Sequence, residues 1–317
     1  MKAVFVEQPG GVENLKYADI PKPSPDPDQA LIKIVASGVN FIDVYFRKGV
    51  YPAPPPIVLG NEGAGTVESV GPGVKNVAPG DRVAYAMARG SYAEYAVVPA
   101  WQLVKIPAAV DFEAAAAVLL QGMTAHYLTH STYPLKPGDS CLIHAAAGGT
   151  GRLIVQMAKM LGARVIGTVG DEEKAKQAKE IGADEVIVYT KDDFAAKAKG
   201  MHVVYDSVGQ STFMKSLDCL RPRGMMVSFG NASGPVTDFA PLVLSQKGSL
   251  YLTRPTLANY SATPEELDWR ANDVLNWMGQ GKLKLHIHKV YPLSDAAQAH
   301  LDLEGRKTTG KLLLRAG

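Results

Sequence analysis

The sequence predicts an α/β protein in which a doubly wound, six-stranded parallel sheet is joined to a second domain of short antiparallel strands. Two observations lead to this prediction. Between residues 140 and 253, short apolar runs alternate with helical patterns, which is typical of a parallel sheet covered on both faces. Before residue 112, strand-like runs are separated by Gly and Pro, which indicates a small antiparallel barrel or sandwich.

The strands of the parallel sheet are predicted from six short apolar runs, at residues 140–146, 163–169, 185–189, 202–206, 225–230 and 249–253. Helices are predicted where apolar residues recur at helical spacing, at 112–130 with Asp111 as N-cap, and at 151–162, 171–182 and 264–281. Strands of the first domain are expected at 30–40, 63–71, 80–87 and 91–99, and a last strand at 310–315.

Composition and charge narrow the classes of function. The chain has 317 residues, enough for two domains, and its formal net charge is only +2. No run of like charges is present, which argues against a surface dedicated to nucleic acid or to an anionic membrane. No apolar run approaches the ~20 residues that span a bilayer, and the N-terminal MKAVFVEQPGG lacks the apolar run of a signal peptide. We therefore expect a cytoplasmic protein.

The two cysteines, Cys141 and Cys219, lie far apart in the sequence and outside any CxxC motif. This pattern favours reduced, buried residues over a disulfide. It also excludes a four-cysteine structural zinc site, because the ligands do not exist.

The most informative stretch is AAAGGTG at residues 145–151. It follows a predicted strand and precedes a predicted helix, and it contains Gly148, Gly149 and Gly151. Glycines let the backbone approach a pyrophosphate, and the helix N-terminus presents free N–H groups to it. The context of strand, loop, helix and second strand predicts a dinucleotide-binding loop.

The end of the second strand indicates which dinucleotide is bound. NAD sites carry an acid there, whereas this strand ends at Gly170 and Lys174 follows within one turn. Without an acid the strand end has room for a 2′-phosphate, and Lys174 can neutralise that phosphate. Both features favour NADPH. The acids at 171–173 are assigned to the helix N-terminus, where negative charge is stabilising. Tyr189, at the end of the third strand, either lies beside the adenosine end or serves only for packing.

Five motifs occur in order along the chain: GVNFIDVY, LGNEGAG, AAAGGTG, VVYDSVG and MVSFGNASG. With them the whole sequence resembles the medium-chain dehydrogenase/reductase superfamily, and within it the zinc-independent NADPH:quinone oxidoreductases. The resemblance implies a catalytic, GroES-like antiparallel β-barrel domain at residues 1–120 and 256–317, and a dinucleotide-binding Rossmann domain at residues 121–255.

The resemblance also bears on metal binding. In the zinc alcohol dehydrogenases of this superfamily the turn at LGNEGAG carries a zinc-binding His, and Asn61 stands in its place. Asn40 stands at the position of the first zinc-binding Cys, while Glu62 is kept. Asparagine is a poor zinc ligand, so the resemblance implies a site without metal.

Other residues carry over by motif. Asn40, Asp43 and Tyr45 are implied to face nicotinamide and substrate, with Tyr51 nearby. The implied cofactor-binding residues are Asn40, Thr124, Gly148, Gly149, Gly170, Lys174, Tyr189, Ser207, Phe229, Gly230, Asn231, Ser233 and Arg306.

The predicted function is NADPH-dependent reduction of a quinone by hydride transfer. Asn40 is expected to hydrogen-bond substrate or nicotinamide, and Tyr45 or Tyr51 to shape the acceptor pocket. No convincing His or Lys is recognised at the site, so catalysis is expected from orientation and exclusion of water. His144, inside a predicted strand, is expected to be a buried, hydrogen-bonded residue.

Two alternative functions remain open. One is reduction of an enone, an alkenal or an enoyl thioester with the same cofactor. The other is a non-catalytic NADPH-binding or RNA-binding role, and the low net charge counts against RNA as the main ligand. A homodimer is expected, because the strand at 249–253 would lie at the edge of the sheet and invite pairing with its own copy.

Overall fold

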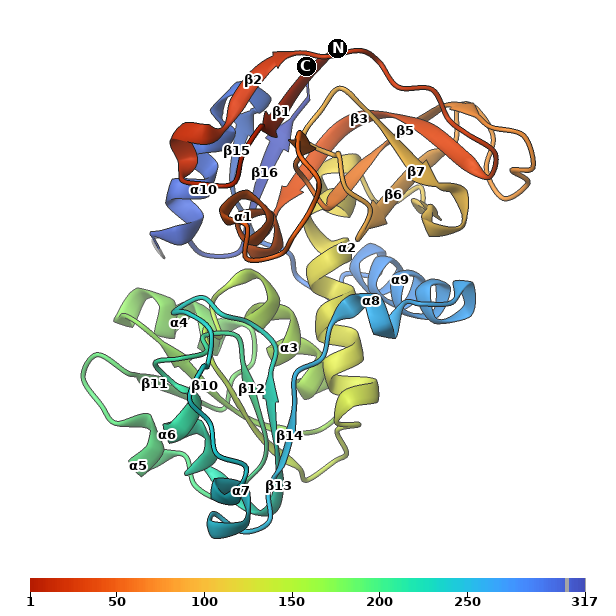
Figure 1. The fold of residues 1–317 in the computed structure, drawn as a ribbon. Helices are drawn as coiled ribbons and strands as arrows, with labels where there is room; N and C mark the ends of the chain where they lie inside the picture. Colours follow the sequence, from red (N-terminus) through yellow and green to blue (C-terminus); the bar gives the residue numbers. More distant parts are fainter. Residues whose placement is uncertain (306–307, 317) are drawn as a thin grey trace. The chain divides into compact units, whose positions relative to one another are not determined.

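The structure is a computed structural model that describes residues 1–305 and 308–316. The chain divides into two compact units, one of Met1–Met123 with Ser261–Gly317 and one of Thr124–Tyr260. Both chain ends belong to the first unit (Figure 1). In the described residues, the structure contains no helix of the length and apolarity needed to cross a membrane.

The second unit is built on a six-stranded parallel sheet with the strand order β11-β10-β9-β12-β13-β14. The order reverses between β9 and β12, as in a doubly wound Rossmann sheet. The strands are β9 (Ser140–Ile143), β10 (Arg164–Val169), β11 (Glu185–Val188), β12 (Met201–Asp206), β13 (Leu220–Ser228) and β14 (Tyr251–Thr253). The helices are α3 (Gly149–Met160), α4 (Glu172–Glu180), α5 (Phe194–Lys197), α6 (Phe213–Leu217), α7 (Leu242–Gln246) and α8 (Leu257–Tyr260).

All six predicted strands of this sheet are present, which confirms the predicted fold class. Strand β9 ends at Ile143, before the predicted end. Ala145 adopts a left-handed φ of 52° and its carbonyl accepts from the Gly148 N–H at 2.8 Å, so the chain already turns toward α3. Asp171 caps α4 by accepting from the Lys174 N–H at 2.8 Å, as expected for an acid at a helix N-terminus.

The first unit contains a seven-stranded sheet in the order β15-β16-β3-β5-β6-β8, with β7 paired to β3, and a small sheet in the order β2-β1-β4. The small sheet is formed by β1 (Lys2–Val6), β2 (Lys16–Asp19) and β4 (Ile57–Val58). The large sheet is formed by β3 (Gln29–Val39), β5 (Glu62–Val70), β6 (Arg82–Ala86), β7 (Tyr95–Pro99), β8 (Val104–Lys105), β15 (Ile287–Pro292) and β16 (Lys311–Arg315).

Four helices complete the first unit: α1 (Phe41–Lys48), α9 (Pro264–Gly279), α10 (Ala296–Glu304) and most of α2 (Phe112–Tyr127). Asp111 starts α2 as predicted, because its Oδ1 accepts from the Ala114 N–H at 2.7 Å. The pairing of β15 with β16 departs from the expected antiparallel pattern, since it is parallel. The connection between these strands contains α10 and is therefore long enough to return the chain in the same direction.

Each unit has its own hydrophobic core. Cys141 and Cys219 are free and buried, as the sequence predicted, and burial raises the pKa of each thiol to about 12. A thiol with so high a pKa is unreactive at neutral pH.

Candidate functional site

A buried polar cluster forms where β3 ends and α1 begins. Asn40 is the N-cap of α1, and its backbone N–H donates to Oδ2 of Asp43 at 2.9 Å. A carboxylate three residues into a helix that reaches back to the N-cap N–H satisfies one of the groups left unpaired there. The local sequence NFID therefore fixes both side chains at the start of one helix.

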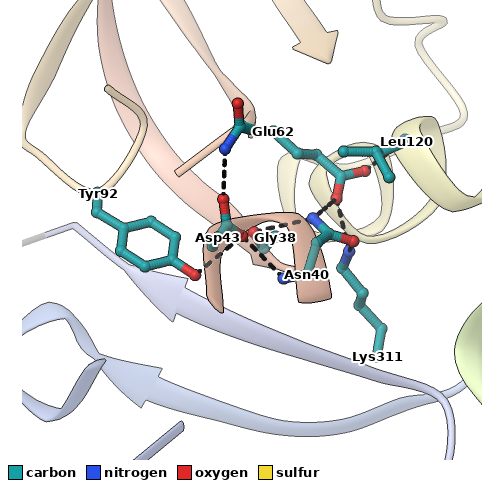
Figure 2. Close-up of polar contacts among 8 residues, drawn as sticks. Gly38, Asn40, Asp43, Glu62, Tyr92, Leu120 and Lys311 are labelled. Atoms are coloured by element: carbon teal, nitrogen blue, oxygen red, sulfur yellow. Dashed lines mark hydrogen bonds and ion pairs between the residues drawn. The ribbon is translucent and has the colours of Figure 1, made fainter. Parts of the chain in front are cut away.

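The side-chain amide of Asn40 is bound on both of its ends (Figure 2). Its Nδ2 donates to Glu62 Oε2 at 2.8 Å and to the Gly38 carbonyl at 3.2 Å. Its Oδ1 accepts from Nζ of Lys311 at 2.6 Å. Lysine only donates and carboxylate only accepts, so these partners leave one possible orientation of the amide.

Glu62, the first residue of β5, connects three segments that are distant in the sequence. Its Oε2 accepts from Lys311 at 2.6 Å as well as from Asn40, and its Oε1 accepts from the Leu120 N–H in α2 at 2.6 Å. The side chains of Lys311 and Glu62 are 1% and 0% exposed. A Cβ at Gly38 would lie 2.1 Å from Glu62 Oε2, so only glycine admits the carboxylate here.

Asp43 links this cluster to a second chain of hydrogen bonds. Its Oδ1 accepts from Asn61 Nδ2 at 2.7 Å, and its Oδ2 accepts from Tyr92 Oη at 3.2 Å. Complete burial raises the pKa of Asp43 to about 6, although these hydrogen bonds act in the opposite direction.

The series of hydrogen bonds continues from Tyr92 through His300 to the guanidinium of Arg47. An Arg47 N–H lies 3.2 Å from His300 Nδ1, and His300 Nε2 lies 3.2 Å from Tyr92 Oη. Because arginine only donates, Nδ1 accepts and the proton resides on Nε2. Burial and the Arg47 charge lower the pKa of His300 to about 3, so the imidazole is neutral at physiological pH.

Lys311 and His300 correct the expectation that no His or Lys belongs to this cluster. Lys311 lies at the start of the predicted last strand, and His300 lies in α10, away from every motif. A charged residue at the start of an otherwise apolar strand is the feature of the sequence that could have indicated a buried role for Lys311. No local pattern singles out His300, because its partners Tyr92 and Arg47 lie more than 200 positions away.

The donor set of the cluster does not fit a catalytic zinc ion. Both Asn40 and Asn61 direct their amide N–H groups at carboxylates. The ammonium group of Lys311 already neutralises Glu62 at 2.6 Å. Zinc needs His, Cys or carboxylate ligands, and the described residues contain no group of three such side chains that could hold a metal.

Tyr45 lies within α1, Tyr51 follows the C-terminus of that helix, and their side chains lie next to one another. Their ring centroids are 5.3 Å apart in an edge-on arrangement, and Phe46 packs on Tyr51 at 5.7 Å. Both tyrosines are half-buried. The structure thus places Asn40, Asp43, Tyr45 and Tyr51 on or beside one short helix, and their assignment to substrate stays a prediction.

In the second unit, the glycine loop leads from β9 into α3. Gly148 is the N-cap of α3, and Gly149 is its first residue. A Cβ at Gly151 would lie 2.2 Å from the Ala145 carbonyl oxygen, so the loop can close onto the helix only with glycine there. The backbone N–H groups of this first turn form the kind of anion-binding terminus that a pyrophosphate needs.

Two of the predicted 2′-phosphate residues, Gly170 and Tyr189, are adjacent at the end of β10. A Cβ at Gly170 would lie 3.0 Å from the hydroxyl of Tyr189, which is therefore adjacent, and the Tyr189 side chain is half exposed. Lys174 lies in the first turn of α4, with its Nζ 3.5 Å from Asp171. Glu172 is paired with Lys191 at 2.6 Å.

The residues after β12 and β13 also meet, at the carboxyl end of the sheet. The Ser207 carbonyl accepts from the Ala232 N–H at 3.2 Å, and a Cβ at Gly230 would lie 2.4 Å from the same carbonyl. Ser233 donates its hydroxyl to the Val208 carbonyl at 2.8 Å. Phe229, Gly230, Asn231 and Ser233 all follow β13 directly, while Thr124 lies in α2 and Arg306 lies outside the described residues.

His144 is buried and hydrogen-bonded, as expected. Its Nδ1 lies 2.8 Å from the Thr168 hydroxyl and its Nε2 lies 2.9 Å from the Ser216 hydroxyl. Burial lowers the pKa of His144, so it is a neutral structural residue.

Comparison with known proteins places these features in context. A family model described as "Alcohol dehydrogenase GroES-like domain" matches residues 26–108, and one described as "Zinc-binding dehydrogenase" matches residues 181–314. The quinone oxidoreductase of Pseudomonas aeruginosa is 48% identical over 313 residues, which cover 96% of each chain. The 2-haloacrylate reductase of a Burkholderia species is 43% identical over 328 residues, which cover 98% of each chain.

Among solved structures, the Escherichia coli quinone oxidoreductase complexed with NADPH superposes with a TM-score of 0.97 at 43% sequence identity. The superposition covers 99% of this chain and 100% of that chain. The similarity therefore extends over the residues of both units described above.

Proposed function

Because the chain belongs to the quinone oxidoreductases of the medium-chain dehydrogenase/reductase superfamily, we propose that it transfers a hydride from NADPH to a quinone. The observation that supports this most directly is the end of β10, where Gly170 lies next to Tyr189, Lys174 follows in the first turn of α4, and the strand tip carries no acid. Bound NADPH supplies the hydride. The loop from Gly148 into α3 would hold its pyrophosphate, and Lys174 its 2′-phosphate.

The reaction works without metal in this proposal. The cluster at the start of α1 supplies fixed hydrogen-bonding groups and one buried cation, Lys311, in place of a Lewis acid. Orientation of the reactants and exclusion of water then account for most of the rate, since a quinone accepts hydride readily. Tyr45 and Tyr51 would shape the acceptor pocket.

The choice of NADPH over NADH is tested at α4. Lys174→Ala should weaken NADPH binding by about 10- to 100-fold, because a hydrogen bond to a charged group contributes roughly 1.5–3 kcal/mol, and should barely change NADH binding. Gly170→Asp should move the preference toward NADH. The new side chain would meet only the hydroxyl end of Tyr189, which can move away. The dissociation constants of NADPH and NADH, measured at one ionic strength for the wild type and both variants, test these expectations.

Lys176→Ala provides the matched control for this comparison. Lys176 lies in the same helix but is exposed. Its loss should leave both dissociation constants within a factor of two. Equal weakening of NADPH and NADH in Lys174→Ala would show that the 2′-phosphate is bound elsewhere.

The acceptor is the second point to be tested. The similarity to a 2-haloacrylate reductase favours one alternative, the reduction of an activated carbon–carbon double bond. With NADPH as donor, we expect kcat/KM for 1,4-benzoquinone to exceed that for 2-chloroacrylate and methyl vinyl ketone by at least tenfold, with or without a chelator. A higher value for either unsaturated carbonyl compound would assign the chain to that alternative, and loss of activity with chelator would contradict a metal-free reaction.

We further propose a cytoplasmic homodimer. Strand β14 pairs only with β13 in the described part of the sheet, and Tyr251 on it is 58% exposed. An open edge with exposed apolar side chains supports pairing with a second copy. Light scattering at micromolar concentration should give the mass of two chains, and the mass of one chain would rule the dimer out.

The reduced state of both cysteines supports a reducing compartment, which localisation of a tagged chain can check.

A further inference from the structure

Asp206, the last residue of β12, carries a fully buried carboxylate at the carboxyl end of the parallel sheet. Its Oδ1 accepts from the backbone N–H groups of Val208 at 2.7 Å and Gly209 at 3.0 Å. Its Oδ2 accepts from two hydroxyls of α6 and its N-cap, at 2.7 and 3.0 Å. These four donors solvate the carboxylate in place of water. The side chain thereby holds residues 207–209, the β12 turn, in one conformation.

The β12 turn is joined to residues 229–233, the β13 segment. The backbone N–H and the hydroxyl of Ser233 both donate to the Val208 carbonyl, at 2.7 and 2.8 Å. A Cβ at Gly230 would lie 2.4 Å from the Ser207 carbonyl oxygen, so the two backbones are in direct contact. A change in the conformation of the β12 turn must therefore also move the β13 segment.

The order of the strands determines which half of a dinucleotide meets these two segments. In the proposed function, the 2′-phosphate lies at the tips of β10 and β11, and the pyrophosphate lies at the glycine loop after β9. Strand β12 neighbours β9 on the side opposite β10, and β13 follows β12. A dinucleotide that runs from β10 across β9 therefore reaches the ends of β12 and β13 with its nicotinamide half.

We propose, in an extension that rests on the proposed function, that Asp206 is a positioning residue for the cofactor. Its carboxylate fixes the β12 turn, and through it the β13 segment, in the conformation that binds the nicotinamide half of NADPH. Asp206 is 0% exposed, so it acts through the backbone that it holds. Without the carboxylate, the cofactor would have to order the turn on binding, which costs affinity. The adenosine half lies over β9 to β11 and should bind independently of Asp206.

Two substitutions separate the hydrogen bonds of Asp206 from its charge. Asp206→Ala removes both bonds to the β12 turn. In Asp206→Asn the amide oxygen can accept from the same two N–H groups, while the NH₂ group faces the hydroxyls of Thr212 and Ser216. Each hydroxyl has a second acceptor within reach, the Gly209 carbonyl at 3.2 Å from Thr212 and the Thr212 carbonyl at 2.9 Å from Ser216. The Asn variant should therefore keep the turn in place.

The test compares NADPH with 2′,5′-ADP, a fragment that carries the adenosine and the 2′-phosphate but no nicotinamide half. Calorimetry gives the dissociation constant of each for the wild type, Asp206→Ala and Asp206→Asn. The readout is the ratio of the two constants within one protein, which a loss of stability alone does not change. The preference for NADPH should fall by at least about 10-fold in Asp206→Ala, the lower end of the effect of losing a hydrogen bond to a charged group. In Asp206→Asn it should stay within about 3-fold of the wild type, the lower end for one neutral hydrogen bond.

Asp139→Ala is the matched control. Asp139 directly precedes β9, at the amino end of the same sheet, and its Oδ2 accepts from the Lys136 N–H at 2.9 Å. This carboxylate also holds a backbone turn, but at the edge opposite the proposed cofactor site. Its loss should destabilise the second unit and leave the ratio of the two dissociation constants unchanged.

An unchanged ratio in Asp206→Ala, whether or not both constants rise, would overturn the positioning role. An equal fall in Asp139→Ala would also overturn it, because general damage to the unit would then explain the result. A fall in Asp206→Asn as large as in Asp206→Ala would contradict the role of the two backbone bonds. A wild-type protein that binds no NADPH or reduces no quinone would instead contradict the proposed function, so the two failures are distinguishable.

Discussion

Replacing Lys311 with Met should lower the free energy of unfolding of the first unit by about 3–5 kcal/mol, the usual effect of leaving one partner of a buried ion pair alone. Glu62 would keep two donors, the Leu120 N–H and Asn40 Nδ2, but would lose the only ammonium group within 4 Å among the described residues. Urea unfolding followed by tryptophan fluorescence measures the change. The chain has three tryptophans, Trp101, Trp269 and Trp277, and all lie in the first unit.

The exposed pair Lys16–Glu7 is the matched control. It has the same 2.6 Å separation as Lys311–Glu62, but its side chains are 52% and 60% exposed. Lys16→Met should change the free energy by no more than about 0.5 kcal/mol, because water already solvates both charges. The double variant Lys311→Met/Glu62→Gln should lose at least about 2 kcal/mol less than the sum of the two single variants. Strict additivity would show that the buried charges do not interact.

Acidification from pH 7 to pH 4 should destabilise the wild-type first unit by about 3 kcal/mol more than the variant His300→Gln. The pKa of His300 is lowered from its ordinary value of 6.5 to about 3 in the folded protein. Below pH 6.5 the unfolded chain binds a proton at this residue that the folded chain does not bind. The contribution of His300 is therefore complete above pH 6.5 and is lost as the pH falls toward 3. Glutamine stays neutral, and it can accept from Arg47 and donate to Tyr92.

Asp43 has the opposite dependence and must be separated from this effect. Its pKa is raised from 3.8 to about 6, so its contribution is complete at low pH and is lost as the pH rises from about 4 to 6. Asp43 is present in both proteins. Its effect on the free energy of unfolding therefore largely cancels when the pH profile of His300→Gln is subtracted from that of the wild type. His288→Gln, a change at an exposed residue of β15, should leave the pH dependence as in the wild type. Parallel pH profiles for wild type and His300→Gln would refute the buried, neutral state of His300.

Local patterns determined the Rossmann unit. Each of its strands is a short apolar run, and the glycine loop lies between a strand and a helix that are adjacent in the sequence. The predicted 2′-phosphate residues Gly170 and Lys174 are only four positions apart, so one strand end and the first turn of α4 place both. The absence of an acid at that strand tip is likewise visible in the sequence.

The polar cluster of the first unit was predicted only in part. Asn40 and Asp43 were predicted from the family resemblance of the motif GVNFIDVY, and the structure places them at one helix start. Neither the orientation of the Asn40 amide nor the partner of Glu62 follows from that motif. Both depend on Lys311, which is 249 positions from Glu62 and reaches it only because β16 pairs with β3 in the same sheet.

The sequence by itself determined the fold class, through apolar runs that alternate with helical patterns, and the glycine loop, which lies within a few consecutive residues. The family resemblance implies that amides replace two zinc-ligand positions. Only the tertiary structure decided what those amides do. Sheet pairing brings Lys311 to Asn40 and Glu62, and the packing of α10 brings His300 to Tyr92 and Arg47. Burial then sets the protonation of Asp43 and His300. The free energy of a charge depends on the water and the partners around it, and folding alone decides both.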